Sequence, residues 1–155
     1  MSFSTVSIQV VTAATTSLLD RVDEGVFDHA VRPDSLREFL ANPAYALVVA
    51  VADDEQVVGM ATGIAYVHPD KPLSLFINEV GVSSKHQRRG VGGQLMARLL
   101  DWGKQRGCIE AWVATGVGNV AARSLYRSTG GVEDEEHAIV YVYPLASDRA
   151  HAGDA

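Results

Sequence analysis

The apolar residues of the chain fall into short runs separated by polar turns, a pattern typical of β-strands. Residues 45–52 and 57–67 form two such runs, and the acidic turn of residues 53–55 between them predicts a hairpin. Residues 68–72 contain prolines that separate this hairpin from the next run. The remaining runs predict strands at residues 7–11, 73–82, 109–114 and 138–143.

Apolar side chains spaced three or four residues apart predict helices between these strands. The hydroxyl groups of residues 15–17 are suited to cap a first helix, and Pro33 stands where a second helix would begin. A long amphipathic helix is expected after residue 90, and Gly107 is placed to end it. A fourth helix is expected over residues 119–129.

The order of these elements predicts a mixed α/β fold, with about six or seven strands in a central sheet and about four flanking helices. A strand, helix, strand crossover over residues 73–114 should make two strands parallel. The length of 155 residues fits one domain, expected over residues 1–145. Residues 146–155 show no apolar periodicity, and we expect a disordered tail there.

Composition narrows the classes of function. A formal net charge of −6 and scattered basic residues argue against nucleic acid as a partner and favour a cationic substrate. No apolar run approaches the roughly 18 residues of a membrane span, and no signal-peptide pattern opens the chain. The single cysteine, Cys108, cannot form an intrachain disulfide, so a reducing cytoplasm is expected. The histidines and acids lack metal-ligand spacing, and no metal is expected.

One stretch joins a predicted strand to the long helix and has the composition of an anion site. Backbone N–H groups at a helix start have no intrahelical partner, and the helix dipole favours negative charge there. Gly90 and Gly92 lack a Cβ atom, so we expect them to let a ligand approach the backbone, and Arg88 and Arg89 add positive charge. The candidate ligand-binding residues are Gln87, Arg88, Arg89, Gly90, Val91, Gly92 and Gly93.

Other phosphate-binding motifs fit this stretch less well. A dinucleotide fingerprint needs a third glycine where Leu95 stands. A P-loop needs a Gly-Lys-Ser/Thr sequence, which does not follow. The plainer alternative is a basic loop that caps an ordinary helix.

The sequence Gln-Arg-Arg-Gly-Val-Gly at residues 87–92 resembles the acyl-CoA signature Q/R-x-x-G-x-G/A of the GNAT superfamily of N-acetyltransferases. A later stretch is similar to a second motif of that family, N-x-x-A-x-x-L-Y-x-x-x-G, which is matched by Asn119, Ala122, Leu125, Tyr126 and Gly130. The resemblance implies the GNAT fold and acetyl-CoA as cosubstrate. It also implies that residues 89–93 hold the pyrophosphate and that the strand end at residues 79–82 pairs with the pantetheine arm.

The resemblance also implies roles in the reaction. Asn119, with Ala122 in the same motif, would contact pantetheine, and Tyr126 would protonate the departing CoA sulfur. A phenol of pKa about 10 is protonated at neutral pH and is able to do so. Asn119 is equally suited to cap its helix, and Tyr126 to pack in the core.

An attacking amine of pKa about 10.4 must first lose a proton. Glu79, a carboxylate in an apolar strand, stands where many members of the family carry a base, and partial burial would raise its pKa. The alternatives are an ion-paired Glu79, or a proton transfer through water or through His68 or His86. The backbone N–H of Val80 or Val82 is expected to bond the thioester carbonyl.

Within the family, residues 18–145 are most similar to the aminoglycoside 3-N-acetyltransferases. The shared features include His86 before residues 87–93, which we call the anion loop, and an acid run after Tyr126. We therefore expect a small polycationic amine as acceptor, with an aminoglycoside as the best candidate. Acid-rich residues 20–28 and 133–136 would attract it. The alternatives are a peptide or protein N-terminal acetyltransferase and a non-catalytic acyl-CoA sensor. The oligomeric state is left open, with a homodimer as one candidate.

Overall fold

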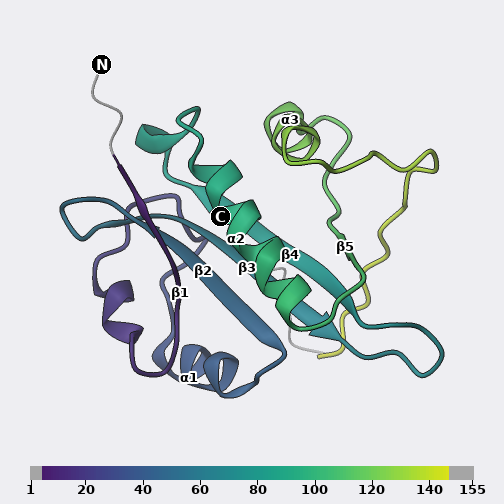
Figure 1. Ribbon diagram of the computed structural model, residues 1–155, viewed down its shortest axis with the longest axis horizontal. Helices are drawn as coiled ribbons and strands as arrows, with labels where there is room; N and C mark the ends of the chain where they lie inside the picture. The colour runs from purple at the N-terminus through teal and green to yellow at the C-terminus, as the bar shows by residue number, and fades with distance from the viewer. Residues whose placement is uncertain (1–4, 147–155) are drawn as a thin grey trace.

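The computed structural model, which describes residues 5–146, contains one sheet in the order β1-β2-β3-β4-β5 (Figure 1). Strands β1 to β4 pair in antiparallel fashion, whereas β4 and β5 are parallel. The hairpin and the parallel crossover are therefore confirmed. The strands are β1 (Ser7–Val10), β2 (Tyr45–Val51), β3 (Val57–Tyr66), β4 (Ser74–Val82) and β5 (Glu110–Trp112).

Helices cover both faces of this sheet. Helices α2 (Val91–Gln105) and α3 (Val120–Ser128) lie on one side, and α2 crosses the sheet in front of β3 and β4 (Figure 1). The 3₁₀ helix η1 (Thr16–Asp20) and helix α1 (Pro33–Ala41) cover the other face. A second 3₁₀ helix, η2 (Ser84–His86), lies between β4 and α2.

The alternation of side chains along β2 explains why the core has two halves, because successive residues of a strand point to opposite faces. Ala46, Val48 and Ala50 pack beneath α2. Leu47 and Val49 pack beneath η1 and α1. All five of these residues are buried, so β2 is a central strand that is apolar on both faces.

Two local predictions were wrong. The first helix is only a 3₁₀ helix of 5 residues. Its expected cap, Thr15, instead accepts a hydrogen bond from the Thr12 backbone N–H at 2.8 Å, so the hydroxyl closes the preceding turn. The strand expected at residues 138–143 does not form, because that segment has no pairing partner within the described chain and all of its residues are exposed.

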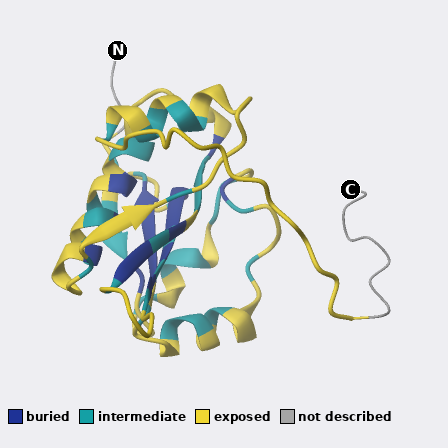
Figure 2. Cartoon of the chain, turned by 90° about the vertical axis from the view of Figure 1, so that its right-hand side faces the viewer, coloured by how far each residue is buried: buried dark blue, intermediate teal, exposed yellow. Residues whose placement is uncertain are grey.

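The element counts change accordingly. The described residues form 5 strands and 3 α-helices, fewer than the six or seven strands and four helices expected, although the α/β class is confirmed. Residues 132–146 leave the folded body as an extended exposed segment (Figure 2). The tail expected at residues 146–155 lies outside the described residues except for Ala146. Within residues 5–146 no helix is long and apolar enough to cross a membrane.

Candidate active site

The loop between β4 and α2 has a backbone built from two left-handed residues. Arg88 has φ of 61° and Gly90 has φ of 79°. A side-chain-bearing residue in this conformation costs about 1–2 kcal/mol, and such strain is concentrated at functional sites. Gln87 fixes the loop to the end of β4, because its Nε2 donates a hydrogen bond to the Val82 carbonyl at 3.0 Å.

The start of α2 has backbone donors without an intrahelical partner. Gly90 is the N-cap residue and no side chain caps the helix. The first bond of the helix runs from the Gln94 N–H to the Gly90 carbonyl at 3.1 Å, so the N–H groups of Val91, Gly92 and Gly93 precede the intrahelical ladder. With Arg88 and Arg89 exposed beside them, these donors fit a ligand that carries a diphosphate.

The two glycines of the motif have different roles. A Cβ atom at Gly90 would meet no protein atom within 4 Å, which leaves open space for a ligand. A Cβ atom at Gly92 would lie 3.2 Å from Leu125 Cδ1. The small size of Gly92 thus lets α3 pack against the first turn of α2, and approach of a ligand to its backbone stays a prediction. Tyr126, the next residue along α3, packs against the same core cluster as α2.

Strands β4 and β5 separate just before the predicted catalytic residue. They pair only along Ser74–Phe76, and the register of β4 against β3 shifts between Ile77 and Glu79, which makes Asn78 a bulge. Beyond this point no strand of residues 5–146 pairs with β4 on its β5 side. The Ser83 N–H donates to Val58 on β3 at 2.9 Å. Because backbone groups alternate along a strand, the N–H groups of Val80 and Val82 face the open side.

A loop from the opposite face of the sheet reaches Glu79. A Cβ atom at Gly81 would lie 2.3 Å from the Val26 carbonyl oxygen, so only glycine lets residues 23–29 cross β4 there. The crossing brings Asp28 close enough to Glu79 to influence its titration. Burial raises the pKa of Glu79, and the charge and hydrogen bond of Asp28 raise it further, while His29 acts in the opposite direction. Asp28 is not among the predicted site residues. The acid-rich composition of residues 20–28 is the feature of the sequence that indicates it.

The later motif places its residues on α3. Asn119 is the N-cap residue, and its Oδ1 accepts a hydrogen bond from the Ala122 N–H at 3.1 Å, so the capping role is present. Burial raises the pKa of the half-buried Tyr126 phenol, which keeps it protonated at neutral pH. Contact of Asn119 and Ala122 with pantetheine, and proton donation by Tyr126, stay predictions.

The other titratable candidates have structural partners. His86 Nδ1 lies 3.0 Å from the hydroxyl of the buried Ser83, which ties η2 to the strand end. His68 pairs with Asp70 in the β3–β4 loop. Neither contact leads to Glu79. In residues 5–146 no group of three or more His, Cys, Asp or Glu side chains could hold a metal ion.

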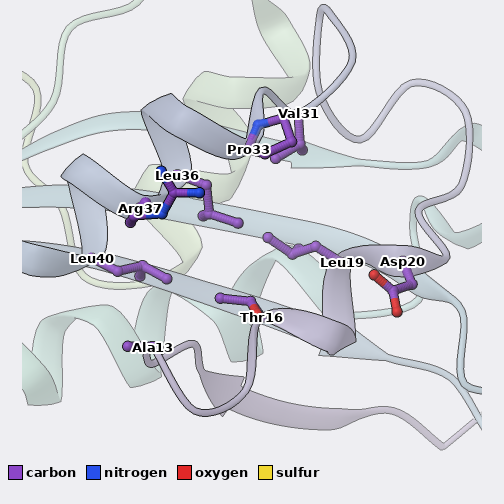
Figure 3. Close-up of a pocket in the computed structure, with 9 residues that line it drawn as sticks. All are labelled: Ala13, Thr16, Leu19, Asp20, Val31, Pro33, Leu36, Arg37 and Leu40. Atoms are coloured by element: carbon purple, nitrogen blue, oxygen red, sulfur yellow. The ribbon is translucent and has the colours of Figure 1, made fainter.

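Two cavities lie away from these residues. One of about 400 Å³ lies between η1 and α1, with apolar residues such as Leu19 and Leu36 in its wall and Asp20 and Arg37 beside them (Figure 3). Another of about 320 Å³ lies beside η2 and includes Lys85 and His86. Neither is lined by Glu79 or Tyr126, so the candidate site is the open side of β4 between the anion loop and Asp28.

The predicted anion loop is thus followed by an uncapped helix start, beside two parallel strands that pair over only three residues. The model of the acetyltransferase (GNAT) family matches residues 13–130, and the chain belongs to that family. The family prediction made from the two motifs is therefore confirmed.

Curated relatives are similar over parts of the chain. An L-2,4-diaminobutyric acid acetyltransferase of Oceanobacillus iheyensis is 36% identical over 69 residues, 44% of this chain and 37% of the relative. An aminoglycoside N(6')-acetyltransferase type 1 of Serratia marcescens is 27% identical over 105 residues, 64% of this chain and 71% of the relative. The matched region thus spans little more than a third of the first relative and most of the second.

Solved structures share the fold at low identity. The aminoglycoside acetyltransferase AAC(6')-Iy, in complex with a bisubstrate analogue of CoA, superposes with a TM-score of 0.74 at 23% identity, covering 91% of this chain and 99% of that chain. An aminoglycoside acetyltransferase from an uncultured soil metagenomic sample gives 0.77 at 21% identity, covering 91% and 97%. These values confirm the GNAT fold.

The contact between Asp28 and Glu79 generates a titration prediction. In Asp28→Asn the charge and hydrogen bond that raise the pKa of Glu79 are lost, so this pKa should fall toward its ordinary range. Carboxyl ¹³C shifts followed against pH measure it directly. Since the folded chain holds this proton more tightly than the unfolded chain, unfolding free energy falls as pH rises from the unfolded to the folded pKa. The fall should be smaller in Asp28→Asn.

The matched control is Asp34→Asn, which removes an exposed acid from the first turn of α1. It should leave the titration of Glu79 unchanged. An unaltered Glu79 titration in Asp28→Asn as well would show that the two carboxyls do not interact in solution.

Proposed function

We propose that the chain transfers an acetyl group from acetyl-CoA to a primary amine of a small polycationic molecule, with an aminoglycoside as the best candidate. One observation carries the proposal: the open side of β4 links an uncapped, positively charged helix start at one end to the Glu79–Asp28 pair at the other. An extended thioester with a diphosphate at its far end suits that arrangement.

The anion loop would bind the diphosphate of acetyl-CoA. The N–H groups of Val91, Gly92 and Gly93, with Arg88 and Arg89, would bind the pyrophosphate, because hydrogen bonds to a charged group contribute about 1.5–3 kcal/mol each. The open-side N–H groups of Val80 and Val82 would pair with the pantetheine arm and polarise the thioester carbonyl. On α3, Asn119 still has its side-chain NH₂ available for pantetheine, since only Oδ1 is used in the cap.

The reaction balances with two proton carriers. Glu79 accepts a proton from the substrate ammonium group, and the free amine forms a bond to the thioester carbonyl carbon. The attacking nitrogen loses its second proton to solvent as the carbon–sulfur bond breaks. The electron pair leaves on sulfur, where Tyr126 provides a proton, and the tyrosinate then regains a proton from solvent, so the products are the amide and the free thiol. A Glu79 with a raised pKa is better matched to an amine than an ordinary carboxylate, because its proton affinity is closer to that of the donor.

The choice of acceptor rests on charge and on the relatives. The Serratia marcescens relative is named as acting on aminoglycosides at the 6' amine, and the similar structures reported above are of aminoglycoside acetyltransferases. None of these names refers to position 3, so nothing supports the 3-N subtype. Asp28 and its neighbours at residues 20–28 are the acids that would hold the non-reacting ammonium groups.

In the acid-rich run at residues 133–136, expected to attract the substrate, one carboxylate is already paired. Glu133 binds Arg123 at 2.8 Å and Arg127 at 2.6 Å, and these hydrogen bonds lower the pKa of its carboxyl to about 2. Its charge is therefore neutralised within the chain and is not free to attract a substrate.

We further propose that the protein acts in the cytoplasm as a homodimer.

A second candidate acceptor is a small amino acid with a side-chain amine. The diaminobutyrate acetyltransferase of Oceanobacillus iheyensis shares the higher identity, although over a shorter stretch. A human N-acetyltransferase 8 is also 30% identical over 131 residues, 75% of this chain and 56% of that relative. A peptide N-terminal acetyltransferase and a non-catalytic acyl-CoA sensor complete the alternatives.

The donor site is tested at Gly90. In Gly90→Val the new side chain fills open space at the start of α2, so acetyl-CoA should bind about tenfold or more weakly, the loss of roughly one charged hydrogen bond. Isothermal calorimetry measures the affinity. The matched control is Gly107→Val at the other end of α2, where φ is 89° and the space is equally open. It should suffer similar backbone strain without loss of affinity. Equal affinities in both variants would contradict the donor site.

The two proton carriers are tested by kinetics. Glu79→Gln should lower kcat/KM by about 10²-fold or more and remove the acidic limb of its pH profile, which we expect above the ordinary range of a glutamate. Tyr126→Phe should lower kcat by a similar factor and leave acetyl-CoA affinity nearly unchanged. A wild-type pH profile in Glu79→Gln would transfer the base role to water.

The acceptor is identified by a panel of kanamycin, 2,4-diaminobutyrate, spermidine and an N-terminal peptide, with thiol release from acetyl-CoA as the readout. We expect kanamycin to react, with a KM that rises with salt because the Debye length is only about 8 Å at physiological ionic strength. Asp28→Asn should raise that KM, whereas Asp101→Asn, on the exposed side of α2, should not. Reaction with the peptide alone would replace the aminoglycoside proposal, and no reaction with any amine would favour the sensor.

A further inference from the structure

Thr62 is the residue of β3 that lies directly opposite Glu79. The register of β3 against β4 pairs Thr62 with Glu79, and the register against β2 pairs Thr62 with Leu47. Residues opposite one another in antiparallel strands project from the same face of the sheet, with Cβ atoms about 4.5–5.5 Å apart. Leu47 belongs to the half of the core beneath η1 and α1, so the side chains of Thr62 and Glu79 are neighbours on that face.

The hydroxyl of Thr62 is buried and lacks a hydrogen bond within the described part of the chain. Its Oγ1 is shielded from solvent, and no group in residues 5–146 pairs with it. A buried hydroxyl that makes no hydrogen bond costs free energy, so most such groups in folded proteins have a partner. The side chain opposite it, Glu79, can accept a hydrogen bond from a hydroxyl when it is ionised. The two side chains are therefore suited to pair in one protonation state of Glu79.

The other groups that act on the Glu79 carboxyl come from the loop that crosses β4. They are Asp28 and His29. The hydrogen bond with Asp28 raises the pKa of Glu79, so it stabilises the protonated form, in which the Glu79 O–H donates to the Asp28 carboxylate. Once Glu79 is ionised it has no proton to donate, and two carboxylates repel each other. The ionised form therefore needs a different hydrogen-bond partner, and Asp28 cannot provide it.

We propose that Thr62 is a positioning residue for the ionised form of Glu79: its hydroxyl donates a hydrogen bond to the carboxylate and holds it ready for the substrate ammonium group. Asp28 then stabilises Glu79 after the proton has been taken up, and Thr62 stabilises it before. Each uptake of a proton thus exchanges one hydrogen-bond partner for the other. The role in proton transfer rests on the proposed function, whereas the hydrogen bond itself does not.

The titration of Glu79, followed by its carboxyl ¹³C shift, tests the hydrogen bond. Thr62→Val removes the donor and nearly keeps the shape of the side chain, so the titration midpoint should move up by about one pH unit. This direction is opposite to that expected for Asp28→Asn. Thr62→Ser keeps a hydroxyl, and its Glu79 should titrate as in the wild-type chain. An unchanged midpoint in Thr62→Val, or equal shifts in the valine and serine variants, overturns the proposal.

Ser74→Ala is the matched control. Ser74 lies on β4, and its Oγ is also buried without a hydrogen bond in residues 5–146, but its opposite residue is Tyr66. Loss of this hydroxyl should leave the Glu79 titration unchanged. A shift as large as that in Thr62→Val would overturn a specific bond to Thr62. Urea unfolding checks that the variants fold, and Thr62→Ala repeats the test with a smaller side chain.

The pH profile of kcat/KM tests the positioning role. In Thr62→Val the acidic limb should move to higher pH by the same amount as the titration, with about tenfold lower kcat/KM below it and unchanged affinity for acetyl-CoA. If no amine reacts while the Glu79 titration moves as expected, the proposed function is wrong and the hydrogen bond is supported. If amines react and the acidic limb of Thr62→Val stays in place, the positioning role is wrong and the proposed function is unaffected.

Discussion

The geometry of the site depends on the short parallel pairing between β4 and β5. Pairing stops at Phe76, and the bulge at Asn78 then bends β4, so the strands separate just before Glu79. Had the ladder continued, the outward N–H groups of Val80 and Val82 would be used by β5 and no extended ligand could pair with them. An interrupted ladder thus converts backbone that normally supports a sheet into a binding surface.

Gly81 and Gly92 each allow another segment of the chain to pack closely on the backbone. Gly81 lets the loop from the η1–α1 side pass over β4, which brings Asp28 to Glu79. Gly92 lets α3 approach the first turn of α2, because it leaves room for Leu125. The surroundings of the Glu79 carboxylate and of the Tyr126 phenol therefore depend on other segments as well as on β4 and α3. The proposed site thus takes its residues from three segments that are distant in sequence.

Local signals in the sequence predicted most of this architecture. Apolar runs gave the hairpin and the parallel crossover, and the pattern of glycines and arginines located the start of α2 because a helix start has a compositional signature. The proximity of Asp28 to Glu79 could not be predicted from the sequence. It depends on residues 23–29 crossing β4, and no periodicity of apolar residues indicates such a crossing. The strand at residues 138–143 was expected for the right reason, its β-branched composition, yet a strand also needs a partner edge.

The contact between Gly92 and Leu125 has a consequence for how this sequence can change over time. A larger residue at position 92 would push on Leu125 and displace α3, and with it the residue next along the helix, Tyr126. A smaller residue at position 125 would make room for it. Substitutions at the two positions should therefore be accepted as pairs, and the anion loop and the α3 motif are expected to diverge together and not independently in descendants of this chain.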